Sequence, residues 1–133
     1  MKPVHVIAAV MTALAVVSCS KPATDTTPPR VVSTSPANMS QDIDPSLTEL
    51  SVTFNEAMTD GNWSWAYRDK ADFPQLTGQP YYDAGKITNT VPVKLEPNKE
   101  YSIWINTEQF TNFKDLAGNA ALPFEFTFKT RAE

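Results

Sequence analysis

Histidine and cysteine, the side chains that most often act as nucleophiles, proton carriers or zinc ligands, each occur once in this chain of 133 residues. They are His5 and Cys19, and both precede the part of the chain that has the pattern of a folded domain. A Ser-His-Asp triad, a Cys-His pair or a His/Cys zinc site therefore cannot form inside that domain. The sequence also lacks the Gly-x-x-x-x-Gly-Lys and Gly-x-Gly-x-x-Gly loops that bind nucleotide phosphates.

The 15 acidic residues leave two chemistries open. A glycosidase needs two carboxylates about 5–9 Å apart in a cleft, and close pairs arise by chance among so many acids, so a carboxylate-dependent hydrolase is a remote alternative. Calcium takes six to eight oxygen ligands. Asp42 and Asp44 lie in a predicted loop, and Asp115 and Asn119 lie in a turn near the C-terminus. These residues are also typical of turns, and we expect no cofactor, with calcium as the alternative.

The aromatic side chains could bind a sugar ring or a protein partner, because their flat faces stack well and anchor interfaces. Alternation along 101–106 places Trp104 on the outer face beside Ser102 and Asn106, if Ile103 and Ile105 face the core. The candidate binding patch has five members: Trp104, Trp63, Trp65, Tyr81 and Tyr82. Trp63 or Trp65 could instead be core residues, and Phe110 and Phe113 are expected to plug the end of the core.

The first 18 residues have the layout of a secretory signal peptide: a basic start, then an apolar run over 6–17. The run is shorter than the about 20 residues that a membrane-spanning helix needs. It ends Val16-Val17-Ser18-Cys19, which resembles the lipobox of bacterial lipoproteins. The resemblance implies that Cys19 receives a diacylglycerol and becomes the new N-terminus, with the membrane as partner. Ser20 after the cysteine favours the outer membrane, and the alternative is an ordinary signal peptide with a stray cysteine.

Residues 19–29 are predicted to be a lipidated N-terminus followed by a flexible tether, because 20–29 contain three prolines and no apolar periodicity. The formal net charge is −4, and loss of Lys2 with the signal peptide makes the mature chain more acidic. Nucleic acid binding depends on Lys and Arg that neutralise phosphates. We therefore expect no nucleic acid partner.

From residue 30 to residue 131 apolar and polar residues alternate in short runs, as half-buried strands require. Pro92 predicts that its strand lies at a sheet edge, because proline cannot donate to a ladder. The pattern of about seven strands, with no amphipathic helix and no disulfide, predicts one all-β domain, an immunoglobulin-like Greek-key β-sandwich. The predicted strands lie at 31–32, 50–54, 63–67, 91–95, 101–105 and 124–128, and 81–82 and 87–90 have a weaker strand pattern.

The segment from Leu95 through Pro97 to Tyr101 has the Leu-x-Pro-x-x-x-Tyr spacing of a tyrosine corner. In that motif the tyrosine hydroxyl bonds to the backbone a few residues upstream and pins the crossing between the two sheets. The alternative is a core tyrosine after a proline turn. Tyr101 is structural in either case.

Taken in order, four segments resemble the bacterial Ig-like domains of cell-envelope proteins, including S-layer proteins: 28–37, 52–58, 113–119 and 126–130. Ala57 is a departure, since proline is common there in that family. The resemblance implies an architecture and a surface role, and it carries no catalytic residues.

These observations predict a non-catalytic lipoprotein of the bacterial cell envelope. Its Ig-like domain would serve as an adhesion, spacer, assembly or binding module with an unidentified protein or glycan partner. The alternative is a small carbohydrate-binding module that uses the exposed aromatic residues.

Overall fold

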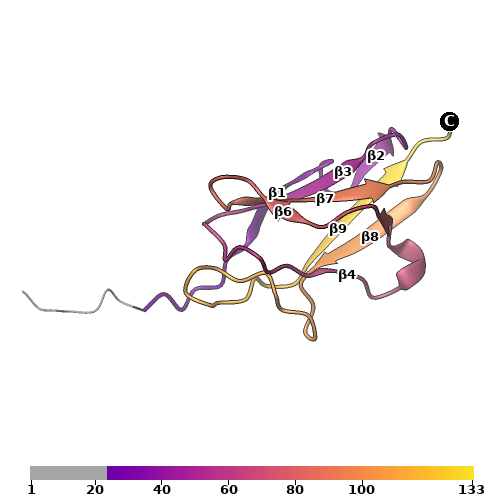
Figure 1. Cartoon of the computed structure of the whole chain (residues 1–133). Coiled ribbons are helices and arrows are strands. Elements are labelled where there is room, and N and C mark those ends of the chain that lie inside the picture. Colours follow the sequence, from indigo (N-terminus) through magenta and orange to yellow (C-terminus); the bar gives the residue numbers. More distant parts are fainter. Residues whose placement is uncertain (1–23) are drawn as a thin grey trace, which may run out of the picture.

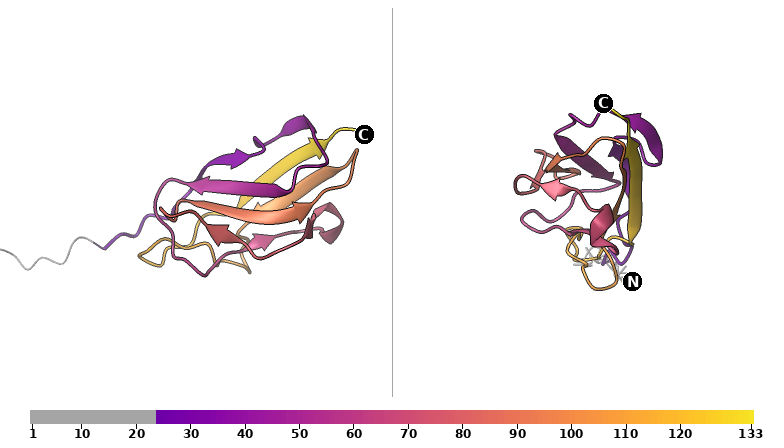
Figure 2. Two further views of the ribbon diagram at one scale, coloured as in Figure 1. Left: turned by 45° about the horizontal axis from the view of Figure 1, so that its top comes forward. Right: turned by 90° about the vertical axis from the view of Figure 1, so that its right-hand side faces the viewer.

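The computed structural model describes residues 24–133. The signal peptide predicted at 1–18, Cys19 and the first part of the predicted tether lie outside the described residues. The described chain forms two sheets packed face to face (Figures 1 and 2), which confirms the predicted all-β Ig-like sandwich. It has nine short strands instead of about seven, together with one 3-10 turn, η1 (Lys70–Asp72).

One sheet has five strands and the other has four. The five-stranded sheet has the order β1-β3-β7-β5, with β6 also paired to β7. Its strands are β1 (Val31–Ser35), β3 (Glu49–Phe54), β5 (Gln75–Leu76), β6 (Tyr81–Tyr82) and β7 (Thr88–Lys94). The four-stranded sheet has the order β2-β9-β8-β4, and its strands are β2 (Ser40–Ile43), β4 (Trp65–Ala66), β8 (Glu100–Ile105) and β9 (Phe124–Thr130).

The core lies between the sheets and follows the predicted alternation on β3, β8 and β9. Along β8 the side chains of Tyr101, Ile103 and Ile105 are at most 1% exposed, while Ser102 and Trp104 between them are half-buried on the outer face. Burial of each such apolar side chain contributes about 1.5–3 kcal/mol. The remaining large core side chains are Leu50, Val52, Phe54, Met58, Val91, Phe113, Phe126 and Phe128.

The strand that contains Pro92 is central, so the prediction of an edge strand was wrong. β7 pairs with β3 along one side and with β6 and β5 along the other. The amide of Val93 donates to the carbonyl oxygen of Thr48 on the β3 side, and the backbone groups of successive residues in an antiparallel strand point to opposite edges. The nitrogen of Pro92 therefore faces the other edge, where the partner changes from β6 to β5 and a missing donor is tolerated.

A second correction concerns residues 42–44, which were expected to lie in a loop. Asp42 and Ile43 belong to β2, which pairs in parallel with β9 at the edge of the four-stranded sheet. β2 contains one apolar residue, Ile43, so it carries no alternating signal in the sequence. Its register is irregular, and Asp42 has a positive φ of 62°.

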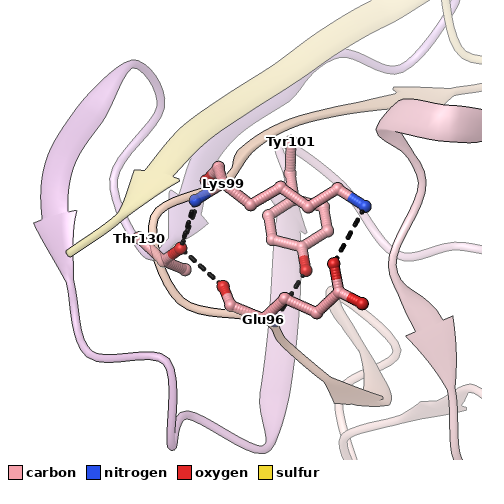
Figure 3. Close-up of polar contacts among 4 residues, drawn as sticks. All are labelled: Glu96, Lys99, Tyr101 and Thr130. Atoms are coloured by element: carbon pink, nitrogen blue, oxygen red, sulfur yellow. Dashed lines mark hydrogen bonds and ion pairs between the residues drawn. The ribbon is translucent and has the colours of Figure 1, made fainter. Parts of the chain in front are cut away.

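The connection between β7 and β8 is held by Tyr101 in the way that a tyrosine corner requires (Figure 3). The hydroxyl oxygen of Tyr101 accepts a hydrogen bond from the backbone N–H of Glu96, with an N···O distance of 2.8 Å. The side chain of Thr130 on β9 donates to the carbonyl oxygen of Glu96 at 2.6 Å and accepts from the N–H of Lys99 at 2.9 Å. Leu95 is buried and Pro97 is exposed. The connection is thus tied to both β8 and β9.

The N-terminal segment of the described chain leaves the sandwich at the end opposite to the C-terminus (Figures 1 and 2). Asp25 is already in contact with the domain, because its carbonyl oxygen accepts a hydrogen bond from the side-chain amide of Asn119 at 2.9 Å. Pro29 is buried. Among the described residues, no helix combines the length and the apolar character that a membrane crossing requires.

Candidate functional site

The best candidate site is a groove along β4, the short edge strand of the four-stranded sheet. Its cavity volume is about 350 Å³, at the lower end of the range for small-ligand pockets. Aromatic or apolar side chains form most of the wall, and none of the residues that line it is charged. The lining residues are Trp63, Ser64, Trp65, Ala66, Tyr67, Leu76, Pro80, Phe110 and Asn112.

The strand β4 and its flanks present the aromatic residues of the groove. Ser64 and Ala66 are buried, whereas Trp63 and Trp65 are half-buried and the side chain of Tyr67 is 45% exposed. The backbone pairs with β8, where Trp65 lies opposite Ile105. Alternation along an edge strand therefore holds three aromatic side chains on the groove side.

Trp65 is the fixed wall of the groove, because both its polar and its apolar atoms are engaged. The indole N–H donates to the side-chain oxygen of Asn89 on β7 at 2.7 Å. The ring meets Phe113 edge-on, with the centroids 6.0 Å apart. A hydrogen bond to β7 and an aromatic contact with the segment between β8 and β9 leave this ring little freedom to rotate.

Phe110 also lines the groove, although the sequence predicts that it plugs the end of the core. Its side chain is 54% exposed, whereas Phe113 is fully buried as expected. The N–H of Phe110 donates to the hydroxyl of Thr107 at 3.1 Å, and its carbonyl oxygen accepts from the N–H of Thr107 at 2.8 Å. This tight turn holds Phe110 outward, and no periodic pattern in the sequence could have indicated it.

Asn106 sets the position of that loop and corrects the prediction that its side chain faces outward. It is fully buried with a φ of 60°, so the alternation of β8 ends there. Its amide nitrogen donates to the carbonyl oxygens of Phe113 and Ala121 at 3.0 and 2.9 Å, and its side-chain oxygen accepts from the N–H of Phe113. These three bonds fasten the loop after β8 to the sandwich end.

Tyr67 lies at one end of the groove, where its ring packs against Phe73 with the centroids 5.3 Å apart. The turn η1 lies between these two residues in the chain, and Asp69 caps it by accepting a hydrogen bond from the N–H of Ala71. Leu76, which is 39% exposed, lines the groove from β5. The groove thus gathers exposed apolar side chains from three separate segments of the sequence.

Of the five aromatic residues predicted to form a patch, the structure brings only Trp63 and Trp65 into the groove. Trp104 lies on the outer face of the four-stranded sheet, with the guanidinium carbon of Arg68 4.0 Å from its ring centre. Tyr81 is exposed and donates to the carboxylate of Glu49 at 3.0 Å. Tyr82 belongs to the core instead of a surface patch, and burial raises the pKa of its hydroxyl.

The four residues proposed as calcium ligands are not gathered into one group. The Asp44 carboxylate accepts from the N–H and hydroxyl of Ser46 and pairs with Arg131 at 3.1 Å. Those hydrogen bonds to Ser46, and then the charge of Arg131, lower its pKa. Asp42 is exposed on β2.

Asp115 instead lies with Asp25 and Glu56, and one carboxylate oxygen of each is within 4.8 Å of the others. Asp115 is buried and accepts from the N–H groups of Ala117 and Asn119 and from the Asn119 side chain. Burial acts to raise the pKa of Asp115, but the hydrogen bonds from Asn119 outweigh it and lower that pKa. The side-chain hydrogen bond to Asp115 raises the pKa of Glu56.

The comparison with protein families decides what kind of domain this is. The family described as "Bacterial Ig-like domain" matches residues 25–130. The chain belongs to this family. The match begins within the predicted tether, at the residue whose carbonyl oxygen bonds to Asn119.

Two solved structures are similar to this Ig-like domain, and both are S-layer proteins. They are the crystal structure of the S-layer protein rSbsC(31-844) and the structure of surface layer protein SbsC, domains 1-6. Both are 21% identical with a TM-score of 0.43, and they cover 79% and 80% of this chain. The chain spans 14% of the length of each. No curated protein matches the chain.

Proposed function

We propose that this protein is a lipid-anchored, non-catalytic protein of the bacterial cell envelope, and that its Ig-like domain binds an envelope partner in the groove along β4. The observation that carries the proposal is the groove itself. Tyr67, Leu76 and Phe110, which are 39–54% exposed, line one cavity together. Contiguous exposed apolar surface on a soluble domain marks an interaction site, whereas scattered single residues do not.

The anchor is proposed from the lipobox-like Val16-Val17-Ser18-Cys19, and the outer membrane from Ser20. The structure adds a spacing argument. Because Asp25 contacts the domain, the chain between Cys19 and that point spans at most about 20 Å, given about 3.3–3.6 Å per extended residue. A tether this short would keep the sandwich close to the membrane with its C-terminal end pointing away.

Two observations support a role without catalysis. The groove has no histidine, cysteine or carboxylate among the residues that line it. The cluster of Asp25, Glu56 and Asp115 is not part of that lining, and the buried member is engaged by backbone amides. A carboxylate pair that could hydrolyse a ligand bound in the groove is therefore missing from its walls.

The anchor is tested by mass spectrometry and fatty-acid labelling of the protein from its own envelope. We expect a mature chain that begins at a lipidated Cys19, and a Cys19→Ser variant that is neither cleaved nor labelled. A mature chain that begins elsewhere with a free thiol would contradict the anchor.

The groove is tested by crosslinking in intact cells, comparing the protein with its Phe110→Ala and Tyr81→Ala variants. Both side chains are about half exposed, at 54% and 47%, but only Phe110 lines the groove. We expect Phe110→Ala to lose the crosslinked partner and Tyr81→Ala to keep it. Equal crosslinking by the two variants would show that the groove is not the binding surface.

A further inference from the structure

We infer that the partner in the groove is a neutral glycan, whose sugar rings lie against the aromatic walls; this inference rests on the proposed function and names the ligand class for the same site. The chemistry of the lining distinguishes a sugar from other occupants in three respects. They are the flat aromatic faces, the polar groups at the edge and the lack of charge.

The aromatic walls match the apolar face of a pyranose ring. Trp63, Trp65, Tyr67 and Phe110 contribute four aromatic rings to one open groove. Trp65 is held by its hydrogen bond to Asn89 and its contact with Phe113, and Tyr67 is supported by Phe73. Rings that are already oriented lose little conformational entropy when a flat ligand stacks on them.

The groove also offers a polar side chain that can bond to the hydroxyl groups of a sugar. Asn112 is exposed at the groove, and its side-chain amide offers both a donor and an acceptor. Its backbone N–H donates to the hydroxyl of Ser64 at 3.0 Å, which fixes this edge of the groove to β4. A sugar hydroxyl that displaces water from this exposed amide replaces its hydrogen bonds, whereas a wholly apolar partner does not.

The absence of charge in the lining favours a neutral glycan over a charged one. None of the lining residues is acidic or basic, so a carboxylate, sulfate or phosphate on the ligand would have no counter-charge inside the groove. Arg68, the next residue after Tyr67, is directed elsewhere: its guanidinium lies over Trp104 and pairs with Glu108 at 3.0 Å. A charged polymer would lose solvation at the aromatic walls without a compensating ion pair.

The experiment uses tryptophan fluorescence and calorimetry with the full chain in its lipidated, detergent-solubilised form. The probes are neutral oligosaccharides of glucose, galactose, mannose and N-acetylglucosamine, with acidic oligosaccharides as the comparison. Of the three tryptophans, Trp63 and Trp65 line the groove and Trp104 does not. In a Trp104→Phe background the emission therefore reports on the groove alone, and we expect a neutral oligosaccharide to shift it.

The matched variants are Tyr67→Ala and Tyr81→Ala, whose side chains are 45% and 47% exposed. We expect Tyr67→Ala and Phe110→Ala to weaken binding about tenfold, as loss of one stacking contact worth about 1.4 kcal/mol would do. Tyr81→Ala should bind like the parent protein, and thermal melts verify that each variant is folded.

Three outcomes would overturn the inference: no binding to any neutral oligosaccharide at millimolar concentration, preference for the acidic ones, or binding that Tyr67→Ala and Phe110→Ala leave unchanged. A crosslinked protein partner that depends on Phe110, together with no glycan binding, would overturn the glycan and keep the proposed function. Loss of both readouts would overturn the two together.

Discussion

Tyr101→Phe isolates the hydrogen bond that ties the β7–β8 connection to the core. The substitution keeps the ring, which is 1% exposed and packs against Phe128 with the centroids 5.3 Å apart. It removes only the hydroxyl that accepts from the backbone N–H of Glu96 at 2.8 Å. The change in stability therefore reports the bond and the donor it leaves behind, without a cavity contribution.

The expected magnitude follows from the surroundings of that donor. A net hydrogen bond is worth about 0.5–1.5 kcal/mol, and leaving a fully buried donor unpaired costs about 1–3 kcal/mol. The Glu96 amide is part-buried, so we expect the free energy of unfolding to fall by about 1–2 kcal/mol. For a domain of this size that lowers the Tm by roughly 4–10 °C.

The assay is urea unfolding followed by tryptophan fluorescence, with thermal melts by circular dichroism in parallel. The matched control is Tyr81→Phe, which removes an exposed hydroxyl bonded to Glu49 and should change stability by less than about 0.5 kcal/mol. Coincident melts of Tyr101→Phe and the parent protein would refute the assignment of the corner.

A Thr130→Val variant extends the test, because Thr130 bonds to the carbonyl oxygen of Glu96 and to the N–H of Lys99 in the same connection. We expect the double variant with Tyr101→Phe to lose less stability than the sum of the two single changes, with a coupling of about 0.5 kcal/mol or more. Strict additivity would show that the two bonds act on separate segments.

Three further predictions concern the core, the acidic cluster and calcium. Ile103→Ala should lower the free energy of unfolding by about 2–5 kcal/mol in denaturant melts. Trp104→Ala should lower it by about 1 kcal/mol, because the ring lies on the outer face and loses only its contact with Arg68. The reverse ranking would contradict the register of β8. Because the pKa of Asp115 is lowered from 3.8, its charge stabilises the fold above that pH, and this contribution is lost as the pH falls through the folded value. Asp115→Asn should therefore lower the Tm at pH 7, and the Tm of this variant should fall less steeply than that of the parent protein below about pH 4. If the Tm values of the two proteins change in parallel with pH, the charge of Asp115 does not stabilise the fold. Millimolar calcium should leave the Tm unchanged, because both carboxylate oxygens of Asp115 already accept hydrogen bonds; a rise of several degrees would show that the ion binds the folded state.

The position of Phe110 in the groove could not be predicted from the sequence. Phe110 and Phe113 are both phenylalanines after β8, and the sequence predicts that both plug the end of the core. The turn at Thr107 and the buried side chain of Asn106 decide that Phe113 points inward and Phe110 outward. That decision depends on hydrogen bonds formed only once the loop packs against the sandwich.

The central position of β7 in its sheet could not be predicted from the sequence either. A proline in a strand predicts an edge, and the prediction fails here because β6 and β5 are two short strands with a break between them. The nitrogen of Pro92 faces that side of the strand. Strand order is a property of the assembled sheets, whereas the rule for proline considers one strand alone.

The sequence by itself determined the elements whose side chains alternate strictly, because period two and burial on one face leave a single register. It therefore predicted the all-β sandwich, the inward faces of β3, β8 and β9, the spacing from Leu95 to Tyr101, and the lack of histidine and thiol chemistry in the domain. Only the tertiary structure decided the groove. Its walls come from three segments around residues 63–67, 76–80 and 110–112, and contacts between segments so far apart are set by how the two sheets close, which no local pattern encodes.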